Sequence, residues 1–163
     1  MKKLYLLRHA HAEEAAQGPM GDNERFLSAR GLAEAETVGD FMRGNGIFPD
    51  FVLSSTSIRT VQTARTVFGR IFREEGQKVR SSFDRVLYLA PANIILQQIE
   101  TVPDDVTALL VVAHNPGIAE LAEFLGCPSG QFVPATLAMF SVPDAGWNDI
   151  GPDTVRMEKL FAP

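Results

Sequence analysis

This chain has little that would tie it to a membrane, to nucleic acid or to an oxidising compartment. Its single cysteine, Cys127, cannot form a disulfide within the chain, which fits a reducing compartment. The net charge of −5 argues against nucleic acid as a partner, because binding a phosphate backbone needs a basic face. Arg8 interrupts the first apolar run, and no later stretch approaches the length that spans a bilayer. We therefore expect a cytoplasmic protein that binds neither nucleic acid nor membrane.

What the chain does have is the composition of one globular domain. Its 163 residues are 45% hydrophobic and 21% charged, enough for a sizeable core, and no repeat, linker or low-complexity tract divides them. We expect a single domain over residues 1–163. Strand-like and helix-like segments alternate, which predicts an α/β fold: a three-layer α/β/α sandwich with helices on both faces of a mostly parallel central sheet.

Individual elements follow from the apolar pattern and from the positions of serine, glycine and proline. Strands are predicted at 4–7, 51–53 and 108–113, with a weaker one at 86–89 and two late strands at 137–142 and 155–160, joined by a hairpin loop over 143–153. Helices are predicted to begin at Ser28, Ile58, Pro91 and Pro116-Gly117, and to end near Gly44, Gly76, Ile99 and Gly126.

Three of the predicted strands lead into side chains suited to anion chemistry. Because the carboxyl ends of parallel strands meet at one edge of a sheet, we expect these side chains to lie close together. Planar guanidinium forks bind anions, and a nearby imidazole acts as a nucleophile or a base. The residues are Arg8 and His9 after the first strand, Arg59 after the second and His114 after the strand at 108–113.

These residues resemble the motifs of the histidine phosphatase superfamily, also called the phosphoglycerate mutase-like family. Arg8-His9-Ala10 stands where the family has Arg-His-Gly, and His114 matches its late strand-end histidine. The family motif Ser-x-x-x-Arg-x-x-x-Thr is matched by Ser55, Arg59 and Thr63. The resemblance runs from residue 4 to about 126 and implies a phosphoglycerate mutase-like fold.

Two further stretches place the chain within that family. The segment Arg25–Gly31 is similar to the small bacterial phosphohistidine phosphatases. Ala15 stands where the mutase branch has an asparagine, which argues against that branch. The resemblance therefore implies a hydrolase that acts on a phosphorylated protein carrying phosphohistidine, or on a small phosphomonoester, and that needs no metal and no cofactor.

The resemblance also implies roles for the four strand-end residues. His9 is the nucleophile and forms a phosphohistidine intermediate, Arg8 and Arg59 hold the phosphoryl oxygens, and His114 donates to those oxygens. Elementary electrostatics agrees, since two nearby arginines disfavour a protonated imidazole and lower its pKa.

The general acid and the remaining substrate contacts are less fully determined. Asp22 stands where the small phosphatases carry a loop aspartate, and we expect it to be the general acid; Glu13 and Asp84 are weaker candidates. Arg25 and Asn115 are expected to bind substrate, although Arg25 could equally be a solvated loop charge. A leaving imidazole, with a pKa of about 6.5, needs a proton far less than an alkoxide does, so a poor acid favours phosphohistidine.

Three alternatives remain open at the level of sequence. The first is a general phosphomonoesterase of the same family that acts on small molecules. The second is a zinc hydrolase built on His9, His11 and His114, which the neighbouring arginines disfavour because they place positive charge beside a cation. The third is a module that binds phosphorylated proteins without turnover, although His9 is retained.

Overall fold

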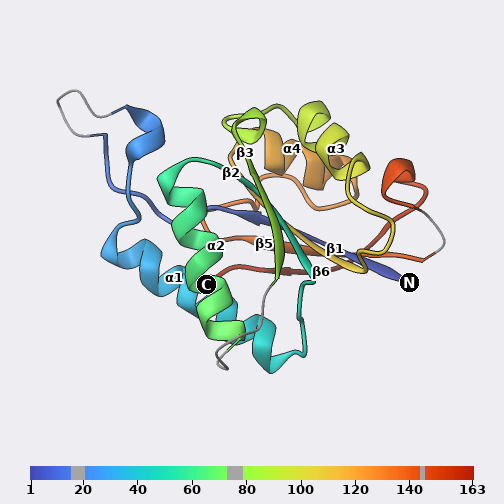
Figure 1. Ribbon diagram of the computed structural model, residues 1–163, viewed down its shortest axis with the longest axis horizontal. Coiled ribbons are helices and arrows are strands. Elements are labelled where there is room, and N and C mark those ends of the chain that lie inside the picture. The colour runs from blue at the N-terminus through green and yellow to red at the C-terminus, as the bar shows by residue number, and fades with distance from the viewer. Residues whose placement is uncertain (16–20, 73–78, 144–145) are drawn as a thin grey trace.

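The computed structural model describes residues 1–15, 21–72, 79–143 and 146–163, and its α/β architecture is the predicted one (Figure 1). Within those residues, six strands form one sheet in the order β3-β2-β4-β1-β5-β6. The first four strands are mutually parallel, and β5 runs antiparallel to both of its neighbours. The strands are β1 (Lys2–Arg8), β2 (Phe51–Ser55), β3 (Arg80–Asp84), β4 (Ala108–Ala113), β5 (Leu137–Val142) and β6 (Arg156–Phe161).

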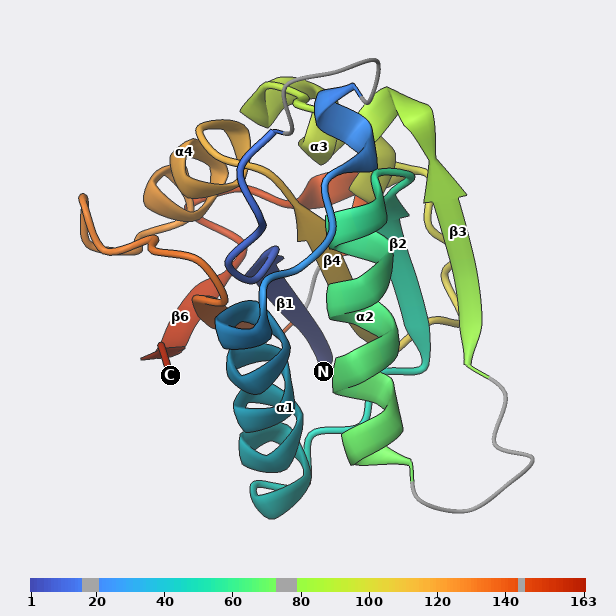
Figure 2. The same cartoon turned by 90° about the vertical axis from the view of Figure 1, so that its left-hand side faces the viewer.

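Helices cover both faces of this sheet, so the predicted three-layer sandwich is confirmed. Helices α1 (Ala29–Gly44) and α2 (Ile58–Ile71) lie on one face, and α3 (Ala92–Glu100) and α4 (Gly117–Phe124) lie on the other (Figures 1 and 2). None of the described helices is long and apolar enough to cross a bilayer.

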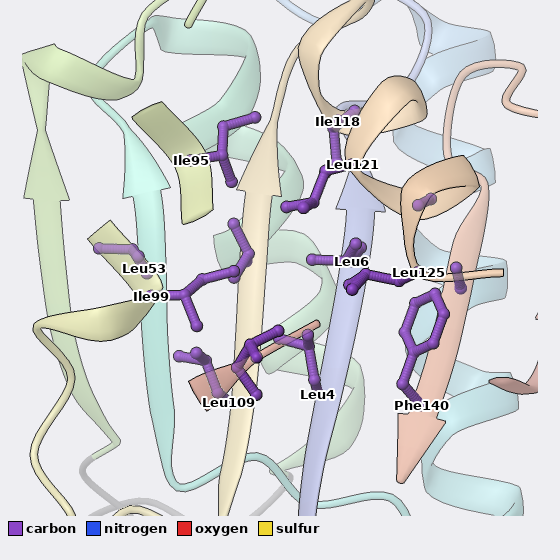
Figure 3. Packing of buried hydrophobic residues seen from close by; sticks show 14 of the residues in the cluster. Leu4, Leu6, Leu53, Ile95, Ile99, Leu109, Ile118, Leu121, Leu125 and Phe140 are labelled. Carbon is purple, nitrogen blue, oxygen red and sulfur yellow. The ribbon is translucent and has the colours of Figure 1, made fainter. Parts of the chain in front are cut away.

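The central strands are continuous apolar runs because both of their faces are buried. In β1, Leu4 and Leu6 pack toward α3 and α4 (Figure 3), whereas Tyr5 and Leu7 pack toward α1 and α2. Successive side chains of a strand point to opposite faces, so one run of four apolar residues supplies two cores. In the register of the sheet, Leu4 lies opposite Leu109 of β4 on one side and opposite Phe140 of β5 on the other.

The predicted strand at 86–89 is wrong. Strand β3 lies earlier, at Arg80–Asp84, where it forms an exposed and largely polar edge of the sheet. The carboxylate of Asp84 accepts a hydrogen bond from the amide of Val86, which starts a 3₁₀ turn over Arg85–Leu87, and Leu89 has a φ of 48°. The apolar signal at 86–89 therefore comes from a turn that buries Leu87.

The other boundaries need smaller corrections. The last strand lies at Arg156–Phe161, one residue later than predicted, and the described part of the loop before it contains a 3₁₀ turn at Trp147–Asp149. Residues 144–145 of that loop, and the predicted end of the second helix near Gly76, lie outside the described residues.

The topology places the predicted site at one edge of the sheet. Strands β2, β4 and β1 are neighbours and parallel, so their carboxyl ends lie together. The amide of His9 donates to the carbonyl of Ala113 at 3.1 Å, which fixes the end of β1 beside the end of β4. A short 3₁₀ turn, η1 (Asp22–Glu24), lies over the start of α2 at the same end of the molecule (Figure 2).

Candidate active site

His9 is held in the form that a nucleophile requires. Its Nδ1 lies 2.7 Å from the carbonyl oxygen of Ala10. Because a carbonyl can only accept, Nδ1 carries the hydrogen, and Nε2 of the neutral ring carries the free electron pair. Burial is the main cause that lowers the pKa of His9 to about 4; the Ala10 contact opposes this, and the charges of Arg59, Arg8 and Arg25 add to it. The ring is therefore neutral at physiological pH.

This lowered pKa gives a first testable result. We expect the ring signals of His9 in an NMR titration to change around pH 4, because burial and the adjacent arginines favour the uncharged ring. Protonation removes the free electron pair of Nε2, so the part of the acid limb of kcat/KM that belongs to His9 should also lie near pH 4. Spectra of His9→Ala assign the signals, and a His9 midpoint near pH 6.5 would contradict the electrostatic account.

Arg59 reaches the site from the first turn of α2. Ser57 caps this helix through a hydrogen bond from the amide of Thr60 to its side chain, and the guanidinium two residues after the cap is almost wholly buried. Its NH1 donates to the carbonyl of Asp22 at 2.6 Å, and its NH2 donates to the Asp22 carboxylate at 2.9 Å. The same NH2 lies 3.3 Å from Nδ1 of His114.

His114 stands beside His9 and is neutral as well. The two ring centroids are 5.3 Å apart in a T-shaped arrangement. Its Nε2 lies 2.8 Å from the hydroxyl oxygen of Ser55, at the end of β2. Burial and then the charge of Arg59 lower the pKa of His114 to about 3. The predicted meeting of two arginines and two histidines is thus present in the geometry.

The outer positions of the Ser-x-x-x-Arg-x-x-x-Thr motif have structural roles that the sequence did not reveal. Ser55 orients the ring of His114, as described above. The hydroxyl of Thr63 accepts a hydrogen bond from the amide of Ala10 at 3.0 Å and donates to the carbonyl of Arg59 at 2.7 Å. Thr63 therefore ties the loop that carries the nucleophile to the helix that carries the arginine.

Arg8 and Asn115 are fixed by one main-chain oxygen. Both side chains donate to the carbonyl of Phe132, each at 2.9 Å. No sequence pattern marks Phe132, because it contributes a carbonyl that every residue has. The Nε–H groups of Arg8 and Arg59 are buried and have no hydrogen-bond partner among the described residues. These donors suit an anion, and the predicted role of Asn115 in substrate binding stays a prediction.

Asp22 lies in the site, but in a state that does not suit a general acid. Its carboxylate contacts Arg59 at 2.9 Å and Arg25 at 3.1 Å, and it accepts a short hydrogen bond from the hydroxyl of Tyr88. The Tyr88 bond is the largest cause that lowers the pKa of Asp22 to about 2; burial opposes it, and Arg25 and Arg59 lower the pKa further. At neutral pH this carboxylate is ionised and has no proton to give.

The alternative acids, Glu13 and Asp84, are not among the residues that line the pocket around His9. The side chain of Asp84 caps the 3₁₀ turn at Arg85–Leu87. Glu13 contributes its main-chain carbonyl, which accepts from Nε of Arg25 at 2.7 Å. Arg25 is therefore fixed in the structure by Glu13 and Asp22 and is not a freely solvated loop charge.

Tyr88 is the site residue that the sequence analysis missed. Besides its bond to Asp22, its ring lies under the guanidinium of Arg59, with Cζ 5.9 Å from the ring centroid, and packs T-shaped on His114 at 5.5 Å. Tyr88 lies within the segment 86–89, whose apolar pattern predicts a strand and gives this side chain no place at the site.

A cavity of about 360 Å³ is lined by Arg8, His9, Asp22, Arg25, Arg59, His114 and Asn115. Arg59 has 3% of its side chain exposed and lies at the bottom, whereas Asp22 has 42% exposed and lies at the opening. His11 also lines the cavity, and its Nδ1 lies 2.7 Å from the hydroxyl of Ser28, the cap of α1. Among the described residues, no three His, Cys, Asp or Glu side chains gather as metal ligands do, so the three-histidine zinc site is not formed.

Comparison with known proteins agrees with this geometry. Residues 4–76 match the model of the histidine phosphatase superfamily (branch 1). The candidate phosphohistidine phosphatase SixA of Agrobacterium tumefaciens has a solved structure that is 30% identical, with a TM-score of 0.80 over 99% of this chain and 98% of that one. This chain belongs to the histidine phosphatase superfamily.

Other relatives span the same length. The uncharacterized protein Rv1276c of Mycobacterium tuberculosis is 34% identical over 94% of this chain and 98% of its own length. The candidate phosphohistidine phosphatase SixA of Nakamurella multipartitia is 26% identical, with a TM-score of 0.83 over 99% of this chain and 96% of that one. The predicted resemblance and the phosphoglycerate mutase-like fold are therefore confirmed. The substrate has to be argued from the geometry and charge of the site.

Proposed function

We propose that this protein is a phosphatase that moves a phosphoryl group from phosphohistidine in a protein substrate to His9 and then to water. The observation that carries the proposal is the state of His9. Its Nδ1–H is bonded to the Ala10 carbonyl, its Nε2 has a free electron pair, and arginines surround it. A neutral imidazole in a cationic pocket is suited to attack a phosphoryl group and unsuited to bind a cation.

The remaining site residues fit charge stabilisation of that transfer. Arg8 and Arg59 have buried Nε–H donors with no hydrogen-bond partner in the described part of the chain, and these donors suit the equatorial phosphoryl oxygens. His114 stands beside the nucleophile, and its Nε2–H, which is directed at the Ser55 hydroxyl in this structure, is the donor that would turn to the same oxygens. After the first transfer, the Ala10 carbonyl stabilises the Nδ1–H of the phosphorylated His9 ring, which carries positive charge.

The choice of phosphohistidine over an ester follows from the leaving group. An alkoxide must be protonated as it leaves, and Asp22 is ionised. A phosphohistidine ring that is already protonated on its free nitrogen leaves as neutral imidazole without any acid. The names of the Agrobacterium and Nakamurella relatives support the same substrate.

A panel of substrates tests this proposal directly. We expect kcat/KM for a protein carrying phosphohistidine to exceed that for a phosphoserine peptide and for small alkyl phosphates, because only the first leaves without an acid. Preference for small phosphomonoesters would replace the proposal by a general phosphatase of the same family. Binding of the phosphoprotein without release of phosphate in a single-turnover assay would indicate a binding module.

A further inference from the structure

The opening of the cavity carries a fixed negative charge, which is unusual for a pocket that binds a phosphoryl anion. Asp22 supplies it, and its two carboxylate oxygens are held separately: Oδ1 by Arg25, and Oδ2 by Arg59 and Tyr88. A carboxylate that only neutralised Arg59 would weaken the grip of that arginine on phosphate. Its position beside the phosphoryl site therefore calls for a function.

The direction of the reaction shows where this charge acts. His9, Arg59 and Asp22 line the same cavity, and Asp22 has 42% of its side chain exposed whereas its ion-pair partner Arg59 has 3% exposed. In phosphoryl transfer the attacking and leaving atoms are roughly in line with phosphorus. A leaving group that belongs to a protein substrate must lie on the open side of the cavity, and among the described residues the partly exposed Asp22 is the acidic side chain that lines it.

We propose that the Asp22 carboxylate, held in place by Tyr88, is the counter-ion of the positively charged nitrogen ring that carries the phosphoryl group, and that it makes the site selective for protonated phosphoramidates. This inference rests on the proposed function and assigns the specificity of the same site. The charge of the carboxylate stabilises the protonated ring of a bound phosphohistidine. The same charge repels a leaving oxygen that becomes negative.

The transfer balances without a proton donor. Nε2 of neutral His9 forms a bond to phosphorus, and the bond between phosphorus and the substrate nitrogen breaks. The electron pair of the broken bond stays on that nitrogen, and the substrate imidazole leaves neutral with the proton on its other nitrogen. Water then attacks phosphorus, the electron pair of the broken bond returns to Nε2 of His9, and inorganic phosphate takes both hydrogens of the water.

Tyr88 is a positioning residue in this scheme. Its hydroxyl donates to Asp22, while its ring packs on His114 and on the guanidinium of Arg59. It therefore keeps the carboxylate at a set distance from the two groups that bind the phosphoryl oxygens. Burial and the neighbouring Asp22 raise the pKa of Tyr88, so its hydroxyl retains the hydrogen that this contact needs.

The test compares leaving groups on one enzyme. The probes are phosphoimidazole, whose protonated ring leaves as neutral imidazole, 4-nitrophenyl phosphate, with an anionic leaving group, and a phosphoserine peptide, with a basic alkoxide. We expect Asp22→Asn to lower the ratio of kcat/KM for phosphoimidazole to that for 4-nitrophenyl phosphate about tenfold or more, the effect of one pKa unit of lost stabilisation. Tyr88→Phe, which keeps the ring, should lower the same ratio by a smaller factor.

Matched controls separate this role from folding and from acid catalysis. Tyr5→Phe removes the hydroxyl of the other tyrosine, buried between the sheet and helices α1 and α2, and should leave the ratio as in the wild type. An unchanged ratio in Asp22→Asn, with His9 still phosphorylated, would overturn the counter-ion while leaving the proposed function intact. A loss greatest for the phosphoserine peptide would make Asp22 an acid. Failure of the wild type to turn over any probe would count against the proposed function itself.

Discussion

The His9→Ala variant should lose turnover by about 10⁴-fold or more, the size of effect that follows removal of a nucleophile. The reason is that Nε2 of His9, whose Nδ1–H is bonded to the Ala10 carbonyl, carries a free electron pair in a ring that lines the cavity. Incubation with phosphoimidazole followed by an acid-free quench and mass spectrometry should find phosphate on His9 of the wild type. The variant should show no label.

A second variant distinguishes the nucleophile from its neighbour. His114→Ala should still accumulate phosphate on His9, but more slowly by about 10²- to 10³-fold, because it removes a stabilising donor and leaves the attacking atom. Thermal unfolding of both variants checks that the fold is retained. Substantial turnover by His9→Ala, or a label on a different residue, would eliminate the covalent mechanism.

The Arg59→Lys variant should lose about 10²- to 10³-fold in kcat/KM although its charge is conserved. Arg59 holds the Asp22 carbonyl and carboxylate with two nitrogens while it contacts His114 with one of them. A lysine ammonium on a flexible stem cannot reproduce that planar set of donors. Steady-state kinetics on phosphoimidazole measures the loss, which should appear in kcat as well as in KM.

Helix α2 provides the control for this substitution. Arg70, on the same helix, binds both carboxylate oxygens of Asp40 at 2.9 and 2.6 Å on the outer surface. Arg70→Lys makes the same chemical change away from the cavity and should retain full activity. Equal losses in the two variants would point to a general effect on α2, and wild-type rates in Arg59→Lys would remove the guanidinium from the reaction.

The parts of the fold that the sequence predicted are those where burial dictates composition. Strands β1 and β4 are buried on both faces and read as unbroken apolar runs. Strand β3 is an edge strand whose side chains are mostly exposed, so Arg80–Asp84 carries no apolar pattern, and the prediction shifted to the apolar turn that follows it. A buried turn and a short strand look alike when only hydrophobicity is read.

The site, like the fold, has a part that the sequence predicted and a part that it did not. Arg8, His9, Arg59 and His114 could be placed because each follows a predictable strand, and topology brings the ends of those strands together. The further lowering of the pKa of Asp22 and the fixed position of its carboxylate could not be predicted, because they depend on a hydroxyl 66 positions away in the chain. The pKa of a loop carboxylate depends on its partners, which the sequence does not show. Asp22, expected to be an acid, is held as a carboxylate of lowered pKa by Arg25, Arg59 and Tyr88.

Strand β1, which leads to the nucleophile His9, comes earlier in the chain than both of its neighbours in the sheet. β1 lies between β4 and β5, whose residues follow it by more than a hundred positions. A growing polypeptide therefore exposes His9 long before the Ala113 carbonyl, His114 or the second neighbouring strand has been made. Closing such distant pairings comes late in folding. The arginines, the second histidine and the carbonyls that surround His9 are thus brought together only when nearly the whole chain has been made.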